Sequence, residues 1–168
     1  MDAVQVLKGA LSSSHVWFDG TCADVSKEQA NFVPAGTAHP IGELAAHVIQ
    51  SEDWFINGML QGKPTIWERD GWGQKLGMPS VVTQTQEVVK GFKGDIAALQ
   101  PYKEAVYKNT EAYLGGLKSA DLDRELEFMG NKMPVGQLFS MLLLGNTFAH
   151  TGEISTLKGI QGARGYPF

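Results

Sequence analysis

An apolar stripe with the period of an α-helix runs through residues 40–61, and it constrains the fold more than any other feature. Its members are Ile41, Leu44, Ala45, Val48, Phe55, Ile56 and Met59. Pro40 suits the first turn of a helix, and Gly62-Lys63-Pro64 is a stop signal after its end. At about 1.5 Å per residue this helix is roughly 30 Å long, a length that suits a helical bundle.

The two ends of the chain also have helical character. The first helix is expected to reach Phe18, and Gly20 lies just past its end. The last helix is expected from about Pro134 to Ile160. Within it, the stretch QLFSMLLL (137–144) is apolar on nearly every side, which is typical of a buried helix.

A further helical region is expected in the middle of the chain, opening at Thr83 or Thr85 and extending to about Leu114. Pro101 should kink or split it, because proline removes an amide donor and clashes with the preceding turn. The segment before it, residues 62–80, carries glycines, prolines and tryptophans without periodicity. It reads as a long ordered loop, and such loops are often functional.

Four helical segments without a strong strand pattern or an internal repeat predict an all-α protein, a four-helix bundle with long inter-helix loops. Residues 121–128 partly alternate and suggest a short extended arm, with a turn at Gly130-Asn131. The chain length of 168 residues suits a single domain over residues 1–168. Because the loops are long, at least one crossover connection is expected.

Charge and composition exclude several classes of function. The net charge of −4 argues against a nucleic-acid partner, since such proteins need a basic face. The longest apolar run, residues 141–144, is too short to cross a membrane, and the N-terminus lacks the features of a signal peptide. A soluble, cytoplasmic protein is the expectation. Its one cysteine, Cys22, is not expected to be a nucleophile, because acidic neighbours raise a thiol pKa.

Polar residues interrupt the two most apolar helices at helical spacing. His47 lies within the stretch 40–61, with Glu43 one turn earlier on the same side. The last helix carries Asn146, His150 and Glu153 as a polar column. Buried polar groups need partners, and a divalent metal ion held between the two helices would provide them. Hydrogen-bonded core histidines are the alternative, and the spacing alone leaves both open.

The other two histidines have structural interpretations. His39 precedes a helix start, where the positive end of the dipole disfavours a charged imidazole, so a surface or capping role is expected. His15 lies near the end of the first helix and is expected to be structural. The tail, residues 164–168, is expected to pack back onto the bundle or onto a partner subunit.

Two segments resemble the DinB/YfiT-like family. The first is DVSKEQANFVPAGTAHPIGELAAHVIQSEDWF, whose Ile-Gly-Glu-Leu opening leads to His47. The second is GQLFSMLLLGNTFAHTGEISTLKGIQG, in which His150-Thr151-Gly152-Glu153 matches the family's last-helix pattern. The resemblance implies a four-helix bundle, often a homodimer, with a divalent metal such as zinc or nickel. Three histidines would hold it, one from the second helix and two from the last. Some relatives are transferases or isomerases that use a low-molecular-weight thiol.

This chain departs from the family at Asn146, where the family has its first last-helix histidine. An amide oxygen is neutral and ligates zinc or nickel more weakly than imidazole. One hypothesis is therefore a metal-dependent, thiol-linked transferase or hydrolase that acts on a small molecule. Its ligands would be His47, Asn146 and His150, with Glu43 or Glu153 as an orienting group or proton acceptor. The alternative is a non-catalytic ligand-binding or dimerising bundle with a degenerate metal site.

Overall fold

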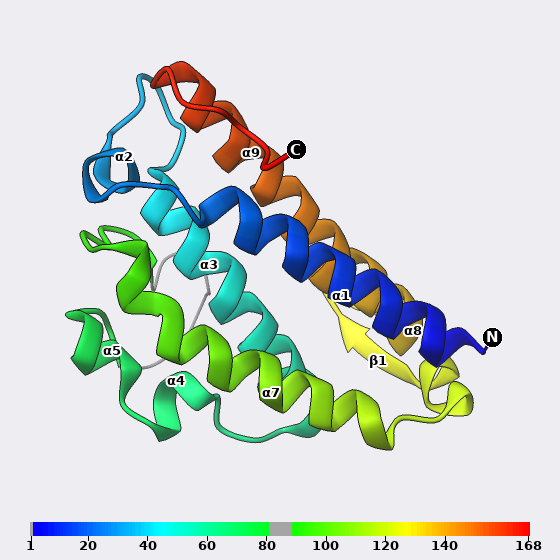
Figure 1. Ribbon diagram of the computed structural model, residues 1–168. Helices are drawn as coiled ribbons and strands as arrows, with labels where there is room; N and C mark the ends of the chain where they lie inside the picture. The colour runs from blue at the N-terminus through cyan, green and yellow to red at the C-terminus, as the bar shows by residue number, and fades with distance from the viewer. Residues whose placement is uncertain (1, 81–88) are drawn as a thin grey trace.

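The computed structural model describes residues 2–80 and 89–168. Within them, four long helical segments pack side by side as a bundle, which confirms the predicted all-α class (Figure 1). Their bounds are α1 (Ala3–Cys22), α3 (Ile41–Asp53) with the π-helical η1 (Trp54–Met59), α7 (Gln100–Gly116), and the consecutive α8 (Val135–Leu138), π-helical η4 (Phe139–Gly145) and α9 (Asn146–Ile160).

The second and third long segments run in the same direction (Figure 1). The connection between them therefore crosses the length of the bundle, as expected from its length. It contains α4 (Ile66–Arg69), α5 (Trp72–Leu76) and the 3₁₀-helix η2 (Ile96–Leu99). The expected helix start at Thr83 or Thr85 lies outside the described residues. Residues 90–95 are not helical, so the helical region expected up to about Leu114 is interrupted before Gln100.

Pro101 does not kink a helix, so that prediction was wrong. It lies in the first turn of α7, whose bounds begin at Gln100. The amide of a first-turn residue has no intrahelical acceptor, so proline costs nothing there.

The end of the first helix was also predicted too early. The helix α1 continues through Gly20 to Cys22, and Pro167 of the C-terminal tail packs on that glycine. A Cβ on Gly20 would lie only 2.8 Å from Pro167 Cγ. The tail therefore packs back onto its own bundle, and the glycine serves close approach rather than helix termination.

A short helix and a β-hairpin preceded by a 3₁₀-helix complete the fold. The helix α2 (Lys27–Asn31) begins with a capping box formed by Ser26 and Gln29. After the 3₁₀-helix η3 (Ser119–Asp123), strands β1 (Glu125–Phe128) and β2 (Asn131–Pro134) pair in antiparallel register, with Phe128 opposite Asn131. The turn between them has positive φ at Met129 and Gly130. This hairpin is the extended arm that the sequence predicted.

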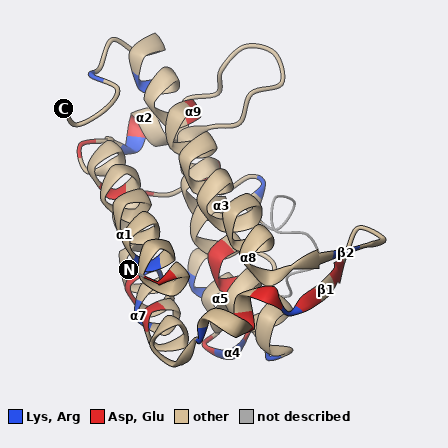
Figure 2. Cartoon of the chain, turned by 90° about the vertical axis from the view of Figure 1, so that its right-hand side faces the viewer, with Lys and Arg blue, Asp and Glu red and all other residues tan. Residues whose placement is uncertain are grey.

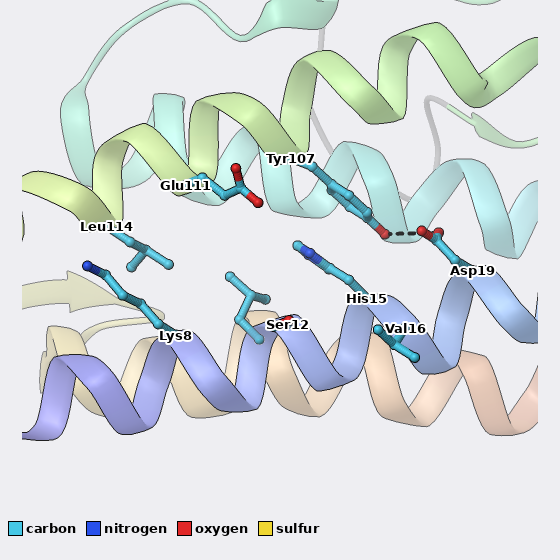
Figure 3. A pocket seen from close by; sticks show the side chains of 9 residues that line it. Lys8, Ser12, His15, Val16, Asp19, Tyr107, Glu111 and Leu114 are labelled. Carbon is cyan, nitrogen blue, oxygen red and sulfur yellow. Dashed lines mark hydrogen bonds between the residues drawn. The ribbon is translucent and has the colours of Figure 1, made fainter. Parts of the chain in front are cut away.

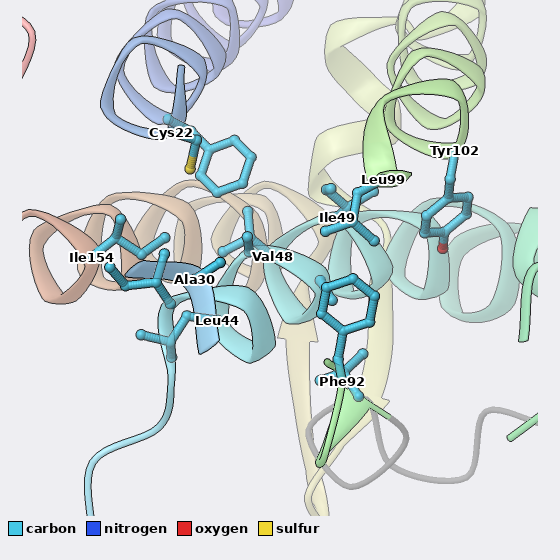
Figure 4. Close-up of a cluster of buried hydrophobic side chains, with 14 of the residues drawn as sticks. Cys22, Ala30, Leu44, Val48, Ile49, Phe92, Leu99, Tyr102 and Ile154 are labelled. Carbon is cyan, nitrogen blue, oxygen red and sulfur yellow. The ribbon is translucent and has the colours of Figure 1, made fainter. Parts of the chain in front are cut away.

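The helix α3 is the centre of the bundle, because all of its residues are buried. Its apolar side chains, among them Leu44, Val48 and Ile49, meet Cys22 of α1 and Ile154 of α9 in one core cluster (Figure 4). A fully buried helix must satisfy its polar side chains inside the protein. The polar side chains of α3 therefore depend on hydrogen-bond partners from the protein itself.

The stretch QLFSMLLL is only half buried, contrary to expectation. Leu138, Phe139 and Leu143 are buried, whereas Met141 is 43% exposed and Ser140 is exposed too. The π-helical geometry of η4 and the position of the segment at the edge of the bundle leave one side open.

Asp53 ties the end of α3 to the crossover connection. Its carboxylate accepts hydrogen bonds from the backbone N–H groups of Ile66 and Trp67, both at 2.9 Å. It also accepts from Tyr102 Oη at 2.7 Å and from Asn57 Nδ2 at 2.8 Å. Burial raises the pKa of Asp53, and the four donors oppose that rise. One buried carboxylate thus joins α3, η1, α4 and α7.

Charged side chains are dispersed over the bundle. In Figure 2 the Lys and Arg positions are scattered among the elements, and carboxylates, including Glu125 and Glu127 of β1, mark the hairpin. None of the helices in residues 2–80 and 89–168 has the length and apolarity required to span a membrane.

Candidate functional site

His47 and His150 meet between α3 and α9. Their ring centroids are 4.9 Å apart with the planes at 87°, an edge-to-face contact. His47 is buried at 9% exposure, and the side chain of His150 is 18% exposed. Two residues more than a hundred positions apart in sequence are therefore paired, as the metal hypothesis required.

Glu153 fixes the orientation of the His150 ring. Its Oε2 lies 2.7 Å from His150 Nδ1, one helical turn away on α9. An ionised carboxylate only accepts hydrogen bonds, so the proton of the neutral imidazole resides on Nδ1 and Nε2 keeps its lone pair. A carboxylate behind one imidazole nitrogen is the usual companion of a histidine that ligates metal through the other.

His47 lies beside a hydroxyl group. Ser51 Oγ, one turn further along α3, is 3.4 Å from both ring nitrogens of His47. This separation is long for a hydrogen bond, so Ser51 constrains the ring less strongly than Glu153 constrains His150.

Glu43, the other candidate acid, has different partners. Its Oε1 accepts a 2.6 Å hydrogen bond from the Gly91 N–H, and its Oε2 lies 3.0 Å from His39 Nδ1. Glu43 thereby links α3 to the segment before α7. The predicted surface or capping role of His39 becomes a partnership with Glu43, which the spacing of four residues could have indicated.

Asn146 is the first residue of α9, one turn before His150, and is partly buried. Across the described part of the chain, no three or more His, Cys, Asp or Glu side chains are arranged to hold a metal ion. The structure pairs two of the three predicted ligands, His47 and His150, and Asn146 remains the predicted third. This set fits a divalent ion only if water or a substrate atom completes the coordination.

Buried polar groups without a hydrogen-bond partner lie on both helices that carry the imidazoles. Gln50, three residues after His47, is fully buried, and neither its Nε2 nor its Oε1 has a hydrogen-bond partner in the described structure. The same holds for Thr147 Oγ1, three residues before His150. Native proteins rarely leave such groups unpaired. The polar atoms of Gln50 and Thr147 can therefore form hydrogen bonds with water or a bound molecule.

A cavity of about 560 Å³ is lined by Glu153, the residue that contacts His150, but by neither His47 nor His150 themselves. Glu153 and His39 line it together with apolar groups of Leu44, Leu157 and Ile160. A narrow crevice that includes His47 shares Leu44 and His39 with this cavity. The sequence did not indicate this cavity, because its walls combine the 37–39 loop with α9.

Cys22 is buried at the end of α1, an environment that disfavours the thiolate. Burial, with a smaller contribution from Asp19, raises the pKa of its thiol to about 12. The sequence predicted the direction from the acidic neighbours, but the larger cause is that Cys22 ends a packed helix rather than lying in a loop.

The chain is similar in sequence to a known family and in fold to a solved structure. The sequence profile of the DinB superfamily matches residues 16–154, a range that includes His47, Asn146 and His150. The crystal structure of a conserved protein from Enterococcus faecalis has a TM-score of 0.80 and 20% sequence identity to this chain. The match covers 96% of this chain and 99% of that chain, and at such identity it concerns the fold alone. No match was found among curated proteins.

Proposed function

The chain belongs to the DinB superfamily, and we propose that it binds one divalent metal ion, zinc or nickel, through His47 and His150 with Asn146 as a third ligand. The observation that carries this proposal is the pairing of His150 with both His47 and Glu153. The carboxylate holds the proton on Nδ1 and leaves Nε2 as a ligand atom.

The proposed activity is a transferase or hydrolase reaction on a small molecule, with a low-molecular-weight thiol or water as nucleophile. A bound ion would supply Lewis acidity and lower the pKa of that nucleophile. Glu153, 55% exposed at the side of the cavity, orients His150 and is placed to accept a proton from a molecule in that cavity. Leu44 and Leu157 exclude water from the apolar part of the substrate.

Metal content tests the proposal directly. Elemental analysis of the purified, untagged chain is expected to find about one ion per chain. His47→Ala and His150→Ala should each lose it, because each removes one of two imidazole ligands. His39→Ala is the matched control, since it removes an imidazole near the cavity but outside the pair, and it should keep the ion. A wild-type chain that stays free of metal after incubation with zinc and nickel would refute the assignment.

The alternative function is a bundle that binds a small ligand without catalysis. The observation that favours it is the largely apolar cavity beside a donor set with only two imidazoles. In that case the wild type and His47→Ala would bind the same ligand equally well without metal.

We also propose that the chain forms a homodimer through an exposed aromatic surface of α1, α9 and the tail. Trp17 contacts Phe148 and Phe168 there, with ring centroids 5.9 and 4.6 Å apart. All three are more than a third exposed, and exposed apolar patches commonly mark interfaces. Sedimentation velocity is expected to show a dimer, and Trp17→Glu should convert it to a monomer. A wild-type monomer at all accessible concentrations would contradict this interface.

A further inference from the structure

A second cavity, of about 410 Å³, lies between α1 and α7 and contains none of the proposed metal ligands (Figure 3). Leu11 from α1 and Leu114 from α7 form apolar parts of its wall. Lys8 and Glu111 also line it, one from each helix. The cavity thus combines apolar surface with charged groups of both signs.

One wall of this cavity is held in place by buried contacts. His15 stacks on Tyr107, with ring centroids 3.6 Å apart and an angle of 7° between the planes. His15 Nε2 lies 2.8 Å from Glu52 Oε2, and the side chains of the two residues are only 13% and 1% exposed. His15, for which the sequence predicted a structural role, therefore joins Tyr107 to Glu52 in this wall. A wall fixed in this way requires little ordering when a ligand binds.

The far end of the cavity has its charges already paired. Asp19 accepts a 2.6 Å hydrogen bond from Lys103 Nζ and a longer one, at 3.4 Å, from the Tyr107 hydroxyl. Burial raises the pKa of Tyr107 far above its ordinary value, so its hydroxyl remains a donor at neutral pH. This end contributes shape and polarity but no unpaired charge.

Lys8 and Glu111 are different. Neither makes a hydrogen bond or ion pair within the described part of the chain, although they carry opposite charges and line the same cavity. In Figure 3 the Lys8 ammonium reaches toward Leu114, and the Glu111 carboxylate points from α7 into the gap between the helices. A ligand with both a negative and a positive group, joined to an apolar body, would satisfy all of these features.

We propose that this cavity binds a small zwitterion, namely a free α-amino acid with an apolar side chain. Its carboxylate pairs with Lys8, its ammonium group pairs with Glu111, and its side chain packs against Leu11 and Leu114. Two charge contacts in a partly open site select the zwitterion over molecules that carry only one of the charges.

Titration of the full chain by ¹H–¹⁵N NMR tests this proposal with L-leucine as the probe. Saturable shifts are expected in α1 and α7 around Lys8 and Glu111. Isoamylamine lacks the carboxylate of leucine and isocaproate lacks its amino group. Each is expected to bind at least about threefold more weakly than leucine, because each loses one charge contact.

Variants separate the two contacts. Glu111→Gln and Lys8→Gln should each weaken leucine binding about three- to tenfold. The controls are Glu104→Gln and Lys108→Gln, at exposed positions of α7 outside the cavity, and they should leave leucine binding unchanged. Circular dichroism verifies that each variant is folded. His47→Ala should bind leucine like the wild type, so this test is independent of the metal proposal. The absence of saturable shifts, shifts confined to α9, or equal binding of either analogue would each overturn the proposal.

Discussion

Replacing Asp53 by alanine is expected to lower the free energy of unfolding by about 3–5 kcal/mol. The carboxylate is fully buried and accepts four hydrogen bonds, two of them from the backbone at the start of α4. Alanine would leave these N–H groups, the Tyr102 hydroxyl and the Asn57 amide without an acceptor. Each unpaired buried donor carries its own desolvation cost, which explains why the loss exceeds that of an ordinary hydrogen bond.

Chemical denaturation monitored by tryptophan fluorescence measures this effect, and Asp70→Ala provides the control. Asp70 is an exposed carboxylate in an ion pair with Arg69, and its loss should change the stability by less than about 1 kcal/mol. The loss of stability in Asp53→Asn should lie between those of Asp53→Ala and Asp70→Ala. The amide retains one acceptor oxygen, but its NH₂ group faces donors. Equal stability of Asp53→Ala and Asp70→Ala would show that the crossover connection does not depend on this carboxylate.

Replacing Asn146 by histidine is expected to tighten metal binding by at least about tenfold. The substitution adds a third imidazole on the face of α9 that carries His150, one turn away. Imidazole binds zinc and nickel more strongly than a neutral amide oxygen does. The site would then contain the three histidines that are typical of the family.

Competition with a chelating dye measures the affinity, and thermal unfolding with and without zinc gives an independent readout. Each tenfold gain in affinity adds about 1.4 kcal/mol of stability at saturating metal. His39→Ala in the Asn146→His background should retain the gain, whereas His47→Ala should abolish it. If Asn146→His bound zinc no better than the wild type, Asn146 would not lie in the coordination sphere.

The existence of the four long helical segments could be predicted from local patterns, because a periodic apolar stripe and a stop signal identify a helix. The segment 40–61 became α3 and η1, and the last helix began and ended where Pro134 and Ile160 indicated. The errors came from residues with two possible roles. Pro101 can break a helix or begin one, and Gly20 can end a helix or allow a close contact. Only the packing decides between such roles.

The candidate site could likewise be predicted from local patterns only in part. Spacing placed His47 and His150 on apolar helices, and the family resemblance identified Asn146 as the departure. Spacing allows Glu43 to pair with either His39 or His47, and it could not show that Glu43 turns to His39 and Gly91. Both histidines lie one turn away, so the choice depends on which groups the neighbouring elements bring close.

The helical class and the two imidazoles considered for a metal followed from the sequence, because they depend on residue type and on the period along one helix. Only the tertiary structure decided the partners of each buried polar group. Asp53, His15 and Glu52 find theirs 13 to 49 residues away in sequence. Such contacts depend on the crossing of whole helices, which no local pattern encodes.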